Sequence, residues 1–230
     1  RLKTKYTEQR KSGTAASIRG NDYQQANIDL AYFEKKIPGK NFTHQWTVGR
    51  QFVTVGRGIA YGQVADGVDY YVKSPKGRIS SWELFAVREL SGDDNSAVYS
   101  ASTIGSAGHT DRQFLGAQVK VRLIPGHTLT LFHVVNDDKN RDSDPIAGKV
   151  QYDSRFQGYG LAGPFPFIKG LSYFGEYISL RGKNFGRAEA RDTAPRDHVV
   201  AFAYDVGLRY SFAANKYTPS VYAQYSNASG

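Results

Sequence analysis

Apolar and polar residues alternate along most of this chain with a period of two. Across residues 199–212 one parity is bulky and apolar, and the other is small, polar or charged. Such alternation is typical of a β-strand whose two faces meet different surroundings. The pattern recurs in residues 25–35, 113–123, 149–159 and 217–226. No apolar stripe with the 3.6-residue period of a helix is sustained, so the chain is predicted to be all-β.

Weaker alternation in residues 80–90, 127–136 and 171–181 brings the expected number of strands to about a dozen. Short turns such as Ile124-Pro125-Gly126 separate some strands, and long polar segments such as residues 136–145 separate others. Short turns on one side and longer loops on the other are typical of outer-membrane barrels. No linker interrupts the pattern, so residues 1–230 are predicted to form a single domain.

The composition of the polar face separates two all-β architectures. A soluble β-sandwich turns its polar face to water, whereas a membrane barrel turns it to a crowded lumen of small residues, glutamines and isolated charges. The second description fits residues 113–123 and 199–212, and aromatic residues such as Trp46, Trp82 and Tyr210 stand near strand ends. We therefore predict a transmembrane antiparallel up-and-down β-barrel. A soluble β-sandwich is the alternative that this pattern does not exclude, because Tyr and Phe are also good strand formers.

Composition and charge narrow the chemistry. The chain has no cysteine, which excludes disulfides, thiolate metal sites and a cysteine nucleophile. Thirty Lys and Arg against 21 Asp and Glu give a formal charge of +9, which indicates an anionic partner. The bases are dispersed along the chain, unlike the clusters of nucleic-acid-binding proteins, so no nucleic acid is expected. The expected partners are small anionic solutes or acidic saccharides, together with the lipid around the barrel.

Bases on the polar parity are the candidate pore-lining residues, because a Lys or Arg facing lipid at mid-membrane costs about 2–4 kcal/mol. Alternation selects Lys120, Arg122, Lys149, Arg155 and Arg209. Lys3 and Lys5 join them if Leu2, Thr4 and Tyr6 face lipid. The alternative is that such bases pair with Asp29, Asp153, Glu176 or Asp205 and only fill the interior.

Arg50 breaks the pattern of its own strand, because it shares the parity of Trp46, Val48 and Phe52. Either a bulge after Gly49 turns it inward, or the strand ends there. The carboxylates of residues 137–144 could form a calcium site, but the spacing and the two bases among them favour a solvated loop. The five histidines form no nucleophilic pair and no metal-binding pair. We therefore expect no catalysis, metal or cofactor.

Two motifs carry a resemblance to a known family. The first is Trp-Thr-Val-Gly-Arg-Gln at residues 46–51, followed by Val-Gly-Arg-Gly at 55–58 and Asp-Gly-Val at 66–68. The second is Thr-Pro-Ser-Val-Tyr-Ala-Gln-Tyr-Ser-Asn-Ala-Ser-Gly at 218–230. Together they resemble outer-membrane porins of the alginate-export type. The resemblance implies a β-barrel with a basic lumen for anionic polysaccharides or small solutes, and a structural or pore-lining role for Arg50 and Arg57.

Members of that family are longer than this chain, so the resemblance implies that the 230 residues form part of a larger, incomplete barrel. A second resemblance is to small barrels specific for acidic oligosaccharides, which have about this length. The resulting hypothesis is a bacterial outer-membrane porin for passive diffusion of anionic solutes or acidic saccharides. Two alternatives stay open: a structural barrel that scaffolds a partner complex, and a soluble basic β-sandwich that binds anionic glycans.

Overall fold

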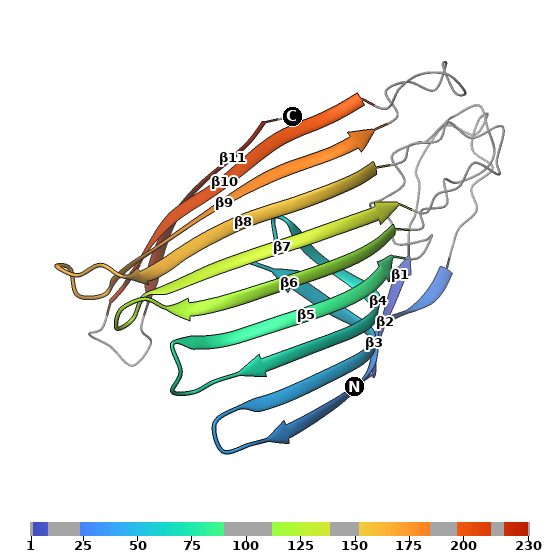
Figure 1. The fold of residues 1–230 in the computed structure, drawn as a ribbon, viewed down its shortest axis with the longest axis horizontal. Helices are drawn as coiled ribbons and strands as arrows, with labels where there is room; N and C mark the ends of the chain where they lie inside the picture. The colour runs from blue at the N-terminus through green and yellow to red at the C-terminus, as the bar shows by residue number, and fades with distance from the viewer. Residues whose placement is uncertain are drawn as a thin grey trace.

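A computed structural model describes residues 2–8, 24–89, 112–138, 152–184, 197–212 and 219–229. These residues form eleven strands (Figure 1). The strands are β1 (Leu2–Glu8), β2 (Gln24–Pro38), β3 (Thr43–Val55), β4 (Tyr61–Lys73), β5 (Ile79–Glu89), β6 (Arg112–Arg122), β7 (Thr128–Asp138), β8 (Tyr152–Pro164), β9 (Leu171–Asn184), β10 (Asp197–Ser211) and β11 (Ser220–Ala228).

All eleven strands belong to one antiparallel sheet, in which each strand pairs with its neighbours in the sequence. The predicted all-β, up-and-down architecture is therefore confirmed. The predicted closure is not present: among the described residues β1 pairs only with β2 and β11 only with β10, so the sheet stays open. No helix in the described part of the chain is long and apolar enough to cross a membrane.

Connections of different length lie at the two ends of the sheet. Residues 39–42, 74–78, 123–127 and 165–170 make short connections at one end. At the other end the connections span residues 9–23, 90–111, 139–151 and 185–196. The link between β3 and β4, only residues 56–60, lies at neither end, because it contacts Glu176 and Asp205 inside β9 and β10.

The β3–β4 hairpin is bent out of the sheet halfway along its length. Residues 51–65 pair only within the hairpin, whereas the rest of β3 pairs with β2 and the rest of β4 with β5. The bend coincides with Gly49, which has a φ of +120°, a value that glycine tolerates and other residues rarely adopt. At the bend Arg50 and Asp66 oppose each other and form an ion pair of 2.8 Å. We call residues 51–65 the hairpin tip.

The hairpin tip lies against the concave face of the curved sheet, and Figure 1 shows it passing behind β5, β6 and β7. Contacts from the tip reach as far as β10 and β11, which requires the sheet to curl around it. The tip and the sheet together enclose one hydrophobic core. The core consists of Val53, Val55, Ala60, Tyr61, Ala65, Phe85, Val87, Phe114, Phe132, Val134 and Ile178.

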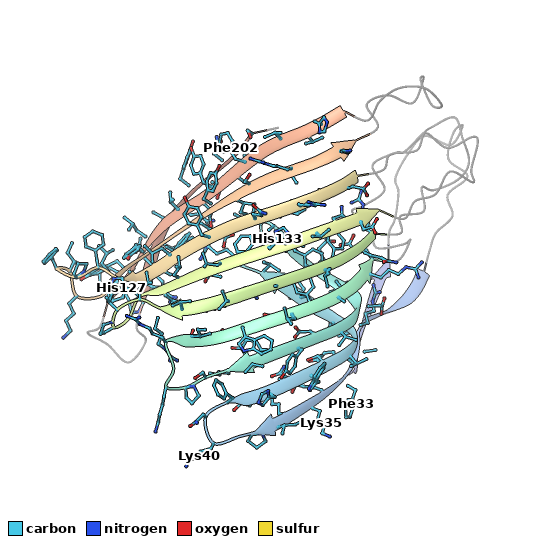
Figure 2. The ribbon with its side chains drawn as sticks, in the orientation of Figure 1. Phe33, Lys35, Lys40, His127, His133 and Phe202 are labelled. Carbon is cyan, nitrogen blue, oxygen red and sulfur yellow. The ribbon has the colours of Figure 1, made fainter. Side chains whose placement is uncertain are left out.

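The convex face of the sheet is apolar and exposed. It carries Phe33, 68% exposed, together with Phe202 at 43%, and Figure 2 labels both. The same face includes Val48, Val68, Leu84, Leu115, Leu131, Tyr159, Tyr177, Val200, Val206 and Leu208. Near the end with short connections the convex face holds an aromatic cluster, in which Trp46 stacks on Tyr70 at 4.1 Å and Tyr70 meets Trp82 edge-on at 5.1 Å.

Candidate functional site

The connection between β3 and β4 places one arginine, Arg57, deep inside the concave side. It is flanked by Gly56 and Gly58, which both have positive φ, of 58° and 94°. A Cβ on Gly56 would overlap Glu176 Oε2 and lie 2.9 Å from the Phe132 ring. The backbone can approach β7 and β9 this closely only because Gly56 has no side chain.

Arg57 is held by four contacts from three strands. Its backbone N–H donates to Glu176 Oε2 at 2.8 Å, and its Nε donates to Asp205 Oδ2 at 2.8 Å. One terminal nitrogen donates to the Tyr222 hydroxyl at 3.2 Å. The guanidinium carbon stands 3.4 Å from the centre of the Phe174 ring, which is a cation–π contact. The other terminal nitrogen has no hydrogen-bond partner among the described residues.

Asp205 is the anchor of this arrangement. It is buried, and besides Arg57 its carboxylate accepts hydrogen bonds from Ser226 Oγ at 2.7 Å and Gln224 Nε2 at 2.5 Å. Three donors satisfy a charge that would otherwise be costly to bury. The Tyr222 hydroxyl in turn donates to Gln224, so β10 and β11 present Arg57 with a connected polar network.

Gln118 fixes the hairpin tip from the β6 side. Its Oε1 accepts the Gly56 N–H at 3.3 Å, and its Nε2 donates to the Thr54 carbonyl at 3.1 Å and to Glu83 Oε2 at 2.5 Å. The amide therefore bonds the backbone on both sides of Val55. With Glu176 and Asp205 it positions the turn at three points, each from a different strand.

A recess of about 740 Å³ opens beside Arg57 at the end with short connections. Its lining combines two arginines, three aromatic residues and several small residues. The lining residues are Arg57, Gly126, Thr128, Ala162, Gly163, Pro164, Ser172, Tyr173, Phe174, Arg209, Ser220 and Tyr222. Guanidinium groups bind carboxylates and phosphates, and aromatic faces pack against the flat side of a ligand ring. The recess therefore suits a small organic anion.

The other candidate bases fall into different environments. Arg122 donates to the carbonyls of Gly77 at 2.5 Å and Ser74 at 3.1 Å, so it caps the β4–β5 connection. Arg209 lines the recess, and its side chain has no hydrogen-bond or ion-pair partner in the described part of the chain. Lys120 shares the concave face with buried Gln118. Among the bases on the concave face, Arg57 pairs with an interior carboxylate, which is the alternative to a pore-lining role.

Neither alternative for Arg50 describes the structure fully. β3 does not end at Arg50 but runs to Val55, and its pairing with β4 has no register shift. Gly49 does change the backbone direction, and Arg50 is drawn into the ion pair with Asp66 at the bend. Its role is to join the two strands of the hairpin where they leave the sheet.

The prediction for Arg155 was wrong. In the sheet Phe156 opposes Val134 of the core, so Arg155 lies on the convex face with exposed Tyr159. Alternation in the sequence predicts that the bulky residues of β8 face outward. In the structure the hydrophobic core lies on the concave face, and Phe156 packs against it. Lys3 and Lys5 lie on β1 opposite Leu30 and Asn27, and their side chains are outside the described part, as is all of Lys149.

Sequence reasoning missed the residues that hold the turn, Gln118 above all. The usable signal was Val-Gly-Arg-Gly between two alternating segments, since a glycine pair around an arginine indicates a tight turn carrying one functional side chain. Most of the acidic run at 137–144 lies outside the described residues. Within the described residues, no group of three or more His, Asp or Glu side chains could hold a metal ion.

Comparison of the chain with protein-family models, with curated proteins and with solved structures gave no match. The geometry of the two faces and of the recess is therefore what indicates a function.

Proposed function

We propose that this chain forms the wall of a transmembrane β-barrel in the bacterial outer membrane, which lets small anionic solutes or acidic saccharides diffuse through its interior. The observation that carries the proposal is the exposed apolar convex face of the sheet. Large apolar side chains cover the exposed convex face from Phe33 on β2 to Val221 on β11, whereas buried Gln118, Glu176 and Asp205 lie on the concave face.

Lipid is the solvent that suits this convex face. Soluble monomers rarely expose a contiguous apolar patch larger than a few hundred Å². Outward apolar residues, an inward polar face and aromatic clusters near strand ends are the features of a membrane barrel. The cluster of Trp46, Tyr70 and Trp82 supports this assignment at one end of the sheet. Closure would require hydrogen bonds along the β1 and β11 edges, because lipid offers none.

Anions are the proposed solutes because of the recess between the hairpin tip and β8 to β11. Arg209 and the free terminal nitrogen of Arg57 offer donors to a carboxylate or a sulfate there, next to the rings of Phe174 and Tyr222. The motif resemblance to porins of the alginate-export type agrees with this solute class and remains part of the proposal.

Reconstitution into planar bilayers tests both parts of the proposal. In a salt gradient, an anion-selective barrel gives discrete conductance steps and a reversal potential of the sign set by the anion. A protein that stays soluble without detergent contradicts the barrel, and a cation-selective current contradicts the anionic solutes. The Arg209→Gln variant is the matched probe of selectivity, with exposed Lys169→Gln in the β8–β9 connection as control.

The hairpin tip favours a second candidate, a structural barrel that scaffolds a partner. The tip and its core occupy the concave side across β5, β6, β7 and β9, which narrows any path for solutes. A protein that inserts into bilayers but gives no conductance supports this candidate over the porin.

A further inference from the structure

Two arginines face each other on the convex side of β8 and β9. Arg155 and Arg181 are direct cross-strand partners, and both are exposed. Their flanking partners in the same row are Val135 on β7 and Val200 on β10. Neither guanidinium has an ion-pair partner among the residues that the structure describes.

Like charges directly opposite each other destabilise a sheet, because cross-strand Cβ atoms are only about 4.5–5.5 Å apart. A shared anion removes that repulsion, and two guanidinium groups at this spacing can bind one phosphate by several N–H donors. Further towards the strand ends, exposed Lys183 opposes His198 on one side and Asp153 on the other. With Asp137 on β7, this surface holds two arginines, one lysine, one histidine and two carboxylates.

The convex face changes character in steps along these strands. Arg155 is the fourth residue of β8, and Arg181 is the fourth from the end of β9. Next on the same face come Gln157 and Ser179, which pair with each other. They are followed by an aromatic row, in which Tyr159 lies 5.6 Å from Tyr177 and Tyr177 lies 6.4 Å from Phe202. Charge, then polar groups, then aromatic rings is the order met on entering a membrane through its headgroups.

We propose that Arg155 and Arg181 bind the phosphate of a lipid headgroup, whose acyl chains lie along the aromatic row of Tyr159, Tyr177 and Phe202. The site rests on the proposed membrane position of the convex face and not on solute transport. Arginines cost little at the membrane interface compared with the midplane, and an anionic headgroup there offsets their charge. The structure thereby assigns a lipid-binding role to a pair of bases that faces away from the interior.

Native mass spectrometry of the detergent-solubilised protein tests this site with phosphatidic acid as the probe and phosphatidylcholine as the reference lipid. We expect the wild-type protein to bind one phosphatidic acid about tenfold more tightly than phosphatidylcholine. The double variant Arg155→Gln, Arg181→Gln removes that preference. The control Lys169→Gln, an exposed base in the β8–β9 connection, keeps it. Arg155→Lys with Arg181→Lys keeps the charge but weakens the preference, because Lys cannot bind phosphate through a fork.

Several outcomes would overturn the proposal. Equal binding of both lipids by the wild-type protein rejects a phosphate site, and this result needs no variant. Full preference in the double variant, or in both single Gln variants if the double variant does not fold, places the site elsewhere. Displacement of phosphatidic acid by millimolar inorganic phosphate identifies free phosphate as the ligand. Insertion into pure phosphatidylcholine vesicles is measured first: success there without a lipid preference rejects this site only, whereas failure to insert rejects the proposed function.

Discussion

The two faces of the sheet contain similar apolar residues in opposite situations. On the convex face Leu84 and Leu115 are exposed, at 49% and 62%. On the concave face Phe85 and Phe114, their direct neighbours in the sequence, are buried at 2% and 7%. The difference comes from the hairpin tip, which covers the concave face and has no counterpart on the convex one. Burial in this protein therefore depends on one bent hairpin, and the convex face depends on what surrounds the molecule.

A charge placed at the middle of the convex face gives the largest expected effect. Leu84→Arg should lower the free energy of unfolding in lipid vesicles by about 2–4 kcal/mol, because the guanidinium would have to leave water for hydrocarbon. Urea titration followed by circular dichroism measures it. Ile124→Arg is the control, since Ile124 lies in the β6–β7 connection and is more exposed, at 60%. Equal, small effects of both substitutions would mean that the convex face meets water.

The concave face is most sensitive at Gly56. Gly56→Ala should destabilise the protein by about 2–3 kcal/mol, because the new methyl group overlaps Glu176 and the backbone has positive φ. In Gly58→Ala the new methyl group meets only Thr54 Oγ1, at 3.3 Å. This variant therefore has the backbone strain of a positive φ without the overlap. The difference between the two variants in urea unfolding isolates the close approach. Identical losses would show that the turn is not packed on β9.

Removing the anchor of Arg57 should have a smaller effect. Asp205→Ala leaves the guanidinium and the donors of Ser226 and Gln224 without their acceptor, and should cost about 1–2 kcal/mol. The loss is moderate because the Arg57 side chain is 37% exposed and water can reach it. Asp205→Asn keeps an acceptor oxygen and should recover part of the loss. Full stability of Asp205→Ala would contradict its role as the anchor of the hairpin tip.

The smallest effect on stability is expected at Arg209, which has no side-chain partner in the described structure. Arg209→Gln should change the free energy of unfolding by less than about 0.5 kcal/mol. The same variant should reduce the preference for anions, measured as a shift of the reversal potential towards zero. A large loss of stability with unchanged selectivity would make Arg209 a structural residue rather than part of the recess chemistry.

Alternation in the sequence predicts the strands well and the direction of their faces less well. For β6 and β10 the predicted faces are correct. Leu115 and Val206 lie on the convex face, and the small and polar residues of the other parity line the concave side. For β8 the faces are reversed, since Phe156 packs on a core that no local pattern reveals. A period of two separates two faces but does not say which one is inside.

The candidate site was predictable only in part. Arg57 was predicted only through the motif resemblance, and Asp205 and Glu176 were named as carboxylates that could pair with interior bases. Their meeting was not predictable, since Arg57 is 148 positions from Asp205 and 119 from Glu176. The bend at Gly49 and Asp66 that brings them together is stabilised by these distant contacts, and short-range pattern carries no information about them.

The bend also has a kinetic consequence. The hairpin pairs with neighbours close in sequence and can form early, but its docking joins residues more than a hundred positions apart and must wait until β6 to β11 have assembled. Contacts formed after the rate-limiting barrier affect unfolding rather than folding. The hairpin tip therefore docks late in folding. Gly56→Ala should leave the folding rate unchanged and increase the unfolding rate.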